Sequence, residues 1–247
     1  MLLALPFTGI GEPGGCEECK KCGKEGAGGG GGGCMISKAI PDDAKPPGKI
    51  SDEQRDELIL LQEEERLAFD VYNKLGEKYP LNPFKNIPRS EANHMEATAQ
   101  LLAYHGLPAP AKLEAGKYAS PKLQKLYNKF IKRGQKSEID ALKVGALVEE
   151  TDIRDLRRMA ENPPSEVAKD LSKQLELASY NHLRAFVRNL SARGVDYRPV
   201  ILEQKDFDQI VGNAKAVDKP RSEGQAKGGG NQKRQRKRAE RGRGRQQ

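Results

Sequence analysis

Acidic and imidazole side chains recur in this sequence at positions where a helical protein normally buries apolar residues. Five of them have the same helical register as the apolar residues around them: Glu65, Glu91, His94, Glu149 and His182. An ionised carboxylate in a protein core costs several kcal/mol unless it is paired or bound to a cation. Carboxylate and imidazole ligands from facing helices suit iron or manganese, whereas a structural zinc site more often uses thiolates. We therefore expect these residues to converge on a non-haem metal site, with two irons as the first choice and manganese as the alternative.

The elements that must position these residues are helices. Between Ser51 and Leu190, apolar residues recur every three or four positions and no alternating strand pattern is present, so we predict an all-α domain. Ser51 and Gln54 form a capping box, and Pro88 is expected to precede the second helix, with Ser90 as a cap. Four long helices, and a short one in the crossover after the second, are expected at about 51–78, 89–106, 120–133, 137–161 and 165–193.

The positions within these helices decide which side chains can reach an ion. Glu91 and His94 are three residues apart, so they lie on one helix face. The apolar stripe favours Glu149 over Glu150 without settling which of the two points inward. His105, near a helix end, is expected to be a satisfied polar residue or a partner of the helix dipole. The acidic neighbours of the candidate ligands are expected to face solvent, namely Glu63, Glu64 and Glu150.

Four segments carrying these residues resemble the ferritin-like superfamily. They are Glu65–Tyr72 (ERLAFDVY), Glu91–His94 (EANH), Val144–Ile153 (VGALVEETDI) and Ser179–Phe186 (SYNHLRAF). The last two are similar in particular to an uncharacterised bacterial and archaeal branch, the ferritin-like domain of unknown function 2202. The resemblance covers about residues 52–192. It implies a ferritin-like four-helix bundle with a di-iron site that reacts with dioxygen or peroxide, as ferritins and rubrerythrins do.

The chain departs from the ferritin-like pattern at the fourth long helix. That pattern expects a glutamate three residues before His182, and this chain has Ser179 there. Asp152, placed like the extra carboxylate of rubrerythrin-like proteins, is the expected replacement as a metal ligand. Without it, the second metal would be held weakly or not at all. Tyr72 is expected near the site as a hydrogen-bonding or redox residue.

The two ends of the chain differ in composition from the part between them. We expect a disordered leader rich in Cys and Gly at 1–49, the ferritin-like bundle at 50–215 and a disordered basic tail at 216–247. All four cysteines lie in the leader, with a spacing typical of zinc or iron–sulfur sites. They form a candidate second metal site, with free or oxidisable thiols as the alternative: Cys16, Cys19, Cys22 and Cys34.

The tail accounts for the basic character of the chain. Residues 219–247 hold eleven Lys or Arg and two Glu, so the rest of the chain is close to neutral although the net charge is +8. Such a segment can bind nucleic-acid phosphates with salt-sensitive, sequence-independent affinity. The candidate contacts are Arg234, Arg236, Lys237, Arg238 and Arg241. The tail has no aromatic residue for base stacking, and a merely solvated basic end is the alternative.

The remaining expectations concern location, partners and activity. No stretch approaches about 18 consecutive apolar residues, so no transmembrane helix is expected. Met1 to Ile10 is apolar but lacks a basic leader and a small-residue cleavage site, so a cytoplasmic location is expected and export is the alternative. A homo-oligomer is left open. The first functional hypothesis is ferroxidase, peroxidase or oxidase activity at the metal; the others are a non-catalytic bundle stabilised by metal ions and a nucleic-acid-associated protein acting through its tail.

Overall fold

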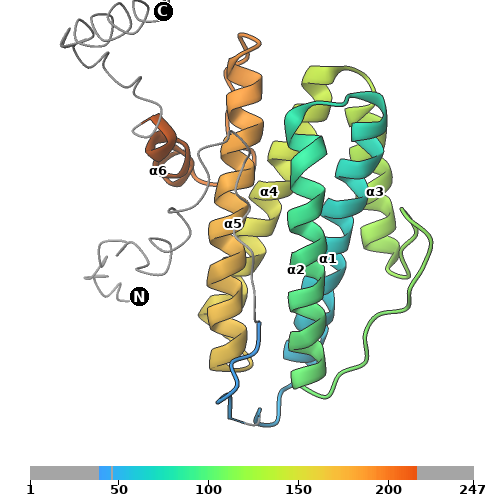
Figure 1. Ribbon diagram of the computed structural model, residues 1–247, viewed down its shortest axis with the longest axis vertical. Helices are drawn as coiled ribbons and strands as arrows, with labels where there is room; N and C mark the ends of the chain where they lie inside the picture. Colours follow the sequence, from blue (N-terminus) through green and yellow to red (C-terminus); the bar gives the residue numbers. More distant parts are fainter. Residues whose placement is uncertain (1–38, 46, 216–247) are drawn as a thin grey trace, which may run out of the picture. The chain divides into compact units, whose positions relative to one another are not determined.

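The computed structural model describes residues 39–45 and 47–215, and no strand occurs among them (Figure 1). These residues form six helices: α1 (Asp52–Lys78), α2 (Asn82–Tyr104), α3 (Pro121–Gly134), α4 (Glu138–Glu161), α5 (Glu166–Ser191) and α6 (Gln204–Lys215). The all-α prediction is confirmed. Among the described residues, those up to Val211 belong to one compact unit and those from Gly212 on to a second.

Serine side chains mark the beginning of four helices. The hydroxyl of each accepts a backbone N–H of the first turn: Ser51 for α1, Ser120 for α3, Ser137 for α4 and Ser165 for α5. At α1 the capping box is complete, because Ser51 Oγ accepts from the Gln54 N–H at 3.2 Å and Gln54 Oε1 accepts from the Ser51 N–H at 3.1 Å. These contacts satisfy N–H groups that lack partners inside the helix. The predicted starts of the four helices are confirmed.

The second helix begins earlier than expected. α2 starts at Asn82, with Pro83 in its first turn and Pro88 in its interior, so the prediction that it follows Pro88 is wrong. Proline is tolerated in a first turn, where its missing N–H has no helical partner, whereas Pro88 removes one helical hydrogen bond. Phe84 and Ile87 are both buried in the first two turns, and their packing offsets that loss.

The four long helices form two pairs. α1 packs along α2 and α4 along α5, and Figure 1 shows the pairs side by side. Residues 79–81 and 162–165 connect the members of each pair, which run antiparallel, and residues 105–137 cross from α2 to α4 with α3 on the way. Leu101 of α2 and Leu156 of α4, both near the C-terminal ends of their helices, belong to one apolar cluster. α2 and α4 therefore run in the same direction.

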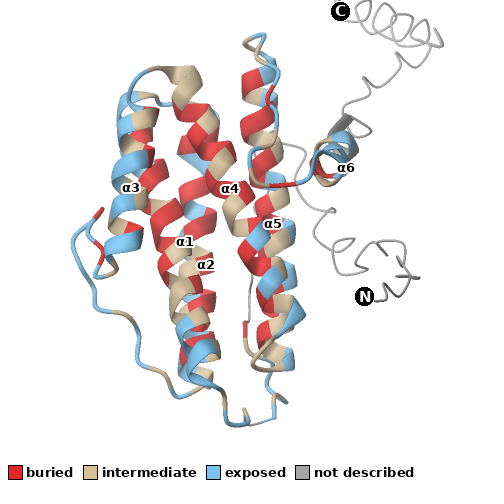
Figure 2. Ribbon diagram, turned by 180° about the vertical axis from the view of Figure 1, so that it is seen from behind, coloured by how far each residue is buried: buried red, intermediate tan, exposed pale blue. Residues whose placement is uncertain are grey.

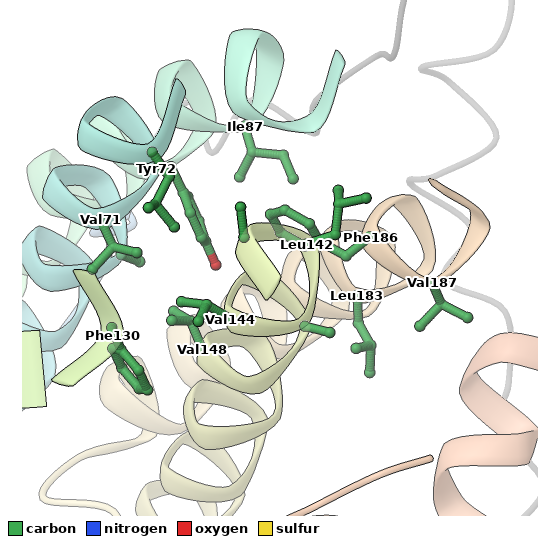
Figure 3. Close-up of a cluster of buried hydrophobic side chains, with 14 of the residues drawn as sticks. Val71, Tyr72, Ile87, Phe130, Leu142, Val144, Val148, Leu183, Phe186 and Val187 are labelled. Carbon is green, nitrogen blue, oxygen red and sulfur yellow. The ribbon is translucent and has the colours of Figure 1, made fainter. Parts of the chain in front are cut away.

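Buried side chains form two apolar clusters within this arrangement, and Figure 2 shows buried positions along all four long helices. One cluster consists mainly of residues from the C-terminal halves of α1 and α5 and the N-terminal halves of α2 and α4 (Figure 3). The other takes the opposite halves of the same helices. The candidate ligands lie near the boundary between the two clusters, so a polar layer crosses the core where each helix changes cluster.

The segment after α5 also packs on the bundle. α6 was not predicted, although the predicted domain extends to residue 215. Phe207 and Ile210 of α6 are buried in the first cluster. Arg157 of α4 pairs with Asp206 at 2.9 Å. The sequence signal for this packing was the run of apolar residues between Tyr197 and Ile210, which we did not assign to an element.

Packed residues also precede α1. Ala39 is buried in the second cluster, and the Tyr104 hydroxyl donates to the carbonyl of Lys45. The end of the segment that we assigned to a disordered leader thus contacts the bundle. The rest of the predicted leader and the predicted basic tail lie outside the described residues. Over the described part of the chain, no helix is both long and apolar enough to cross a membrane.

Candidate metal centre

The five candidate ligands meet at the polar layer. All are buried: Glu65 from α1, Glu91 and His94 from α2, Glu149 from α4 and His182 from α5. His182 is the most exposed of them, at 7%. Their donor atoms form two groups of three residues, with the atoms of each group within 4.8 Å of one another, and Glu91 belongs to both groups. The expected convergence is therefore present.

The first group consists of Glu65, Glu91 and His94. Nδ1 of His94 lies 3.2 Å from Oε2 of Glu65 and 2.9 Å from Oε2 of Glu91. On the other side of the ring, Nε2 of His94 lies 3.2 Å from Oγ of Ser90. A hydrogen bond donated by Nε2 to that hydroxyl leaves the Nδ1 lone pair facing the carboxylates, as a metal ligand requires. We predicted Ser90 only as a helix cap, and its spacing of four from His94 was the missed signal.

The second group consists of Glu91, Glu149 and His182. Nδ1 of His182 lies 3.0 Å from Oε1 of Glu91 and 3.5 Å from Oε2 of Glu149. The rings of His94 and His182 are stacked, with centroids 5.6 Å apart and an interplanar angle of 26°. The two oxygens of Glu91 thus face different imidazoles.

Tyr72 supports the second group from the apolar cluster. Its hydroxyl donates to Oε1 of Glu149 at 2.5 Å. Its ring packs against Phe84 and Phe186, at centroid distances of 6.2 and 5.3 Å, and Figure 3 shows the side chain reaching from α1 toward α4. Gly145 makes this packing fit, because a Cβ at that position would lie 2.2 Å from the Phe186 ring. Tyr72 therefore stands beside the centre, as expected.

Burial and mutual contact together set the pKa values of the cluster. Burial lowers the pKa of His94, but the carboxylates of Glu65 and Glu91 outweigh it and hold that pKa well above its ordinary value. Burial also lowers the pKa of His182, but the carboxylates of Glu91 and Glu149 outweigh it and raise that pKa to about 10. Burial raises the pKa of Glu65 to about 7 and also raises that of Glu149. At Glu91 the imidazoles outweigh burial and hold the pKa well below its usual range. The cluster therefore shares protons, which a cation would displace.

The cluster also contains buried polar atoms without hydrogen-bond partners. They are Oε1 of Glu65, and Oε1 of Glu91 and Nδ1 of His182, which lie 3.0 Å apart but do not have the geometry of a hydrogen bond. Buried polar atoms in folded proteins are nearly always hydrogen-bonded, so such a group points to a missing partner. Iron and manganese accept both carboxylate oxygen and imidazole nitrogen. The donor set therefore fits a metal, and two groups that share one carboxylate fit two ions.

Asp152 and Ser179 lie next to the cluster and outside its two groups. Oγ of Ser179 donates to Oδ2 of Asp152 at 2.5 Å and lies 3.0 Å from the carbonyl oxygen of Leu175. Burial raises the pKa of Asp152 well above its ordinary value, and the charges of Glu65 and Glu149 add to the rise. The serine at the position of the expected glutamate therefore holds the carboxylate that we predicted as its replacement.

Glu150 contradicts the expectation that it faces solvent. Its side chain is completely buried on a different face of α4 from Glu149, which is the one that faces the cluster. Oε1 of Glu150 accepts from the Tyr197 hydroxyl at 2.6 Å. Oε2 accepts three backbone N–H groups at 2.7 to 3.0 Å, those of Val200, Ile201 and Leu202. The segment after α5 covers this face, and the periodicity of α4 alone could not reveal it.

Glu63 and Glu64 also differ from the expectation of solvent exposure. Glu63 is buried, and its carboxylate lies 3.6 Å from the Arg66 guanidinium. Glu64 is half-buried, and burial together with the charge of Asp155 raises its pKa to about 8. For Glu63 the cause is again an unanticipated cover, since Arg66 donates to three carbonyls of the crossover, those of Leu113, Glu114 and Lys117.

The other candidate residues are accounted for as follows. Nε2 of His105 lies 3.1 Å from Oγ of Ser165, but its buried Nδ1 has no hydrogen-bond partner, so the expectation that this helix-end residue is satisfied holds for one ring nitrogen only. The candidate cysteine site and the candidate nucleic-acid contacts lie outside the described residues: Cys16, Cys19, Cys22, Cys34, Arg234, Arg236, Lys237, Arg238 and Arg241.

Comparison with known proteins shows the family to which the chain belongs. A family model described as an uncharacterized protein domain, DUF2202, matches residues 54–214. The chain belongs to this family. This DUF2202 chain is 41% identical over 170 residues to the uncharacterized protein MJ0754 of Methanocaldococcus jannaschii. The aligned region covers 68% of this chain and 92% of that protein. The crystal structure of the hypothetical protein MJ0754 from Methanococcus jannaschii is similar at a TM-score of 0.66 and 40% identity, covering 68% of this chain and 97% of that one.

Proposed function

We propose that the DUF2202 domain of this chain binds two metal ions, iron as the first choice and manganese as the alternative, with Glu91 between them. The observation that carries the proposal is the position of Glu91, whose two oxygens lie 2.9 and 3.0 Å from the Nδ1 atoms of different imidazoles. Such a carboxylate can bind one ion through each oxygen. Glu65 and His94 would complete one ligand set, and Glu149 and His182 the other.

We further propose that the bundle is ferritin-like. Two antiparallel helix pairs joined by one long crossover, with α2 and α4 running in the same direction, support this interpretation. Ligands that project inward from four helices, including a glutamate and a histidine three residues apart, are also typical of ferritin-like metal sites. Asp152 is proposed as a further ligand, oriented by Ser179, in place of the glutamate that the ferritin-like pattern expects.

The proposed activity is that of a ferroxidase, peroxidase or oxidase. Bound iron would supply electron transfer to dioxygen or peroxide. The chain's own residues would keep bulk water out of the buried site and hold the ligands in place. Ser90 would hold the tautomer of His94, and the Tyr72 hydroxyl would orient Glu149 by the hydrogen bond that it donates. A bundle that metal ions merely stabilise would use the same ligands without turnover.

Metal content tests the ligand proposal. The full chain is loaded anaerobically with Fe(II) and compared with the double variant His94→Ala/His182→Ala by elemental analysis. About two irons per chain are expected in the wild type, as in di-iron bundles, and none retained in the variant. His105→Ala is the matched control, because His105 lies outside the cluster and should be replaceable without loss of iron. A wild type that binds neither iron nor, after loading with Mn(II), manganese would reject the proposal.

Turnover separates the two functional alternatives. The loaded protein is assayed for catalytic consumption of dioxygen and of hydrogen peroxide. Consumption that is lost in the double histidine variant and kept in His105→Ala supports the oxidoreductase. Two bound irons without turnover would leave a metal-stabilised bundle.

A further inference from the structure

A small cavity lies among α1, α3 and α4. Its volume is about 20 Å³, which is room for one or two water-sized molecules. Apolar side chains provide most of its wall: Leu67 and Ala68 from α1, Leu126 and Phe130 from α3, and Val148 from α4. Figure 3 shows Phe130 and Val148 within the same buried cluster. Leu126 is only partly buried, so the cavity reaches toward the surface.

Three polar side chains also line the cavity: Glu64, Thr151 and Asp152. The Thr151 hydroxyl donates to the carbonyl of Leu147 at 2.8 Å. One oxygen of Asp152 accepts from Ser179. Apolar atoms nevertheless form most of the cavity surface, and such a surface favours an apolar guest. A fully hydrated cation is excluded by the volume.

The cavity adjoins the proposed metal centre. Asp152 lines the cavity, and its carboxylate feels the charges of Glu65 and Glu149 of the cluster. Two other lining residues, Glu64 and Val148, precede those same two cluster residues in the sequence. Asp152 therefore belongs to the cavity wall and also interacts with a candidate ligand of each group.

We propose that this cavity is a binding and entry site for dioxygen, a small apolar molecule of two atoms, on its way to the metal centre. The inference rests on the proposed function for the role of dioxygen, and it adds the face of the bundle by which dioxygen arrives. Hydrogen peroxide is polar, so a cavity whose surface is mostly apolar suits it less well than dioxygen. Peroxide should therefore not depend on this cavity.

Dioxygen itself is the probe in the first test. The full chain is treated with Zn(II), so that any bound metal is diamagnetic, and methyl relaxation is measured by NMR under nitrogen and under dioxygen. Leu67 and Val148 line the cavity, and Leu61 and Val187 are buried methyl groups outside it. Dioxygen should enhance relaxation several-fold more at the two cavity residues. Equal enhancement at all four would overturn the proposal.

Filling the cavity gives the second test. Val148→Ile adds one methylene to its wall, and Val144→Ile makes the same change one turn earlier on α4, at a buried residue that does not line the cavity. The dioxygen effect at Leu67 should fall several-fold in the first variant and stay unchanged in the second. If Val148→Ile fails to fold, Ala68→Val fills the same space from α1. An unchanged effect in a folded, filled variant would overturn the proposal.

The iron-loaded protein links the cavity to function. Val148→Ile should consume dioxygen several-fold more slowly than the wild type, with the same iron content and the same rate with peroxide, and Val144→Ile should behave as the wild type does. Equal dioxygen rates would overturn the entry site and leave the metal centre in place. A wild type that binds neither iron nor manganese would overturn the proposed function and, with it, the role given to this cavity.

Discussion

Glu149 and Glu150 are neighbours on α4 and both are buried, yet their surroundings differ. Glu150 accepts four hydrogen bonds, three of them from backbone N–H groups. Glu149 accepts one, from Tyr72, and otherwise faces His182 and Glu91. A carboxylate whose lone pairs are met by N–H and O–H donors anchors the chain, whereas one that faces an imidazole and a second carboxylate is suited to a cation. Burial alone therefore does not mark a metal ligand, and the bonding partners do.

The two carboxylates should fail in different ways when they are removed. Glu150 fastens the segment after α5 to the bundle, so its loss should lower stability and leave metal binding intact. Glu149 belongs to the proposed centre, so its loss should lower metal binding and cost little stability. The following changes test that contrast.

Replacing Glu150 with alanine should have the largest effect on stability. Four donors lose their acceptor, and each buried donor left unpaired costs about 1–3 kcal/mol unless water reaches it. The free energy of unfolding should therefore fall by roughly 3–5 kcal/mol, as for other broken buried networks. Urea denaturation of the metal-free full chain measures it. Iron content per folded chain should stay as in the wild type.

An exposed carboxylate provides the control for Glu150→Ala. Glu77 pairs with Lys74 on the surface of α1, at 2.6 Å and with most of its side chain exposed. Glu77→Ala should change the free energy of unfolding by less than about 1 kcal/mol, because surface ion pairs contribute little. If Glu150→Ala were as mild as this control, or if it released iron, the anchoring role would be refuted.

Replacing Glu149 with glutamine should act mainly on the metal. Glutamine keeps the shape and can still accept from Tyr72, but it removes the negative charge of one ligand in the second group. About one iron per chain should be lost, because Glu65 and His94 remain for the first position. Elemental analysis after anaerobic loading measures the loss. In the metal-free chain, the free energy of unfolding should change by less than about 1 kcal/mol, since a buried charge also disappears. Retention of both irons would contradict the assignment.

The sequence was sufficient to predict α1, α3, α4, α5 and the polar layer, for local reasons. Serine caps and the proline after α1 mark helix ends by their own hydrogen-bonding chemistry, so α1, α3, α4 and α5 could be placed within a residue or two. The register of Glu65, Glu91 and His182 against their apolar neighbours predicted which face they would occupy. Neither inference needed knowledge of distant contacts.

Two of the misses depend on contacts between distant segments. Glu150 is buried because residues 195–202 cover a second face of α4, and a helix buried on two faces loses the simple apolar stripe. The first turns of α2 form despite Pro88 because Phe84 and Ile87 pack in the core. The third miss is local: Ser90 lies four residues before His94 on α2, and its hydroxyl is equally suited to a helix cap. In each case the local pattern permitted two outcomes.

Removing the Tyr72 hydroxyl tests how Glu149 is held. In Tyr72→Phe, Glu149 loses its one hydroxyl donor while the ring packing stays. Iron at the second position should bind about 10–100-fold more weakly, as when other supporting hydrogen bonds to metal ligands are lost. Titration against a competing chelator measures the affinity. Ser90→Ala is the counterpart for the first position, where it should weaken the iron held by His94. Unchanged affinity in Tyr72→Phe would show that Glu149 needs no support.

The smallest expected effect is that of Tyr197→Phe, which makes the same chemical change on the other side of α4. Here the lost hydroxyl is one of four donors to Glu150, and the three backbone N–H groups keep that carboxylate in place. The free energy of unfolding should fall by about 1 kcal/mol, as for a typical single hydrogen bond, and iron affinity should not change. Because both variants delete one hydroxyl that donates to a buried carboxylate, their difference isolates the role of the carboxylate. Weakened iron binding in Tyr197→Phe would mean that the two faces of α4 are coupled.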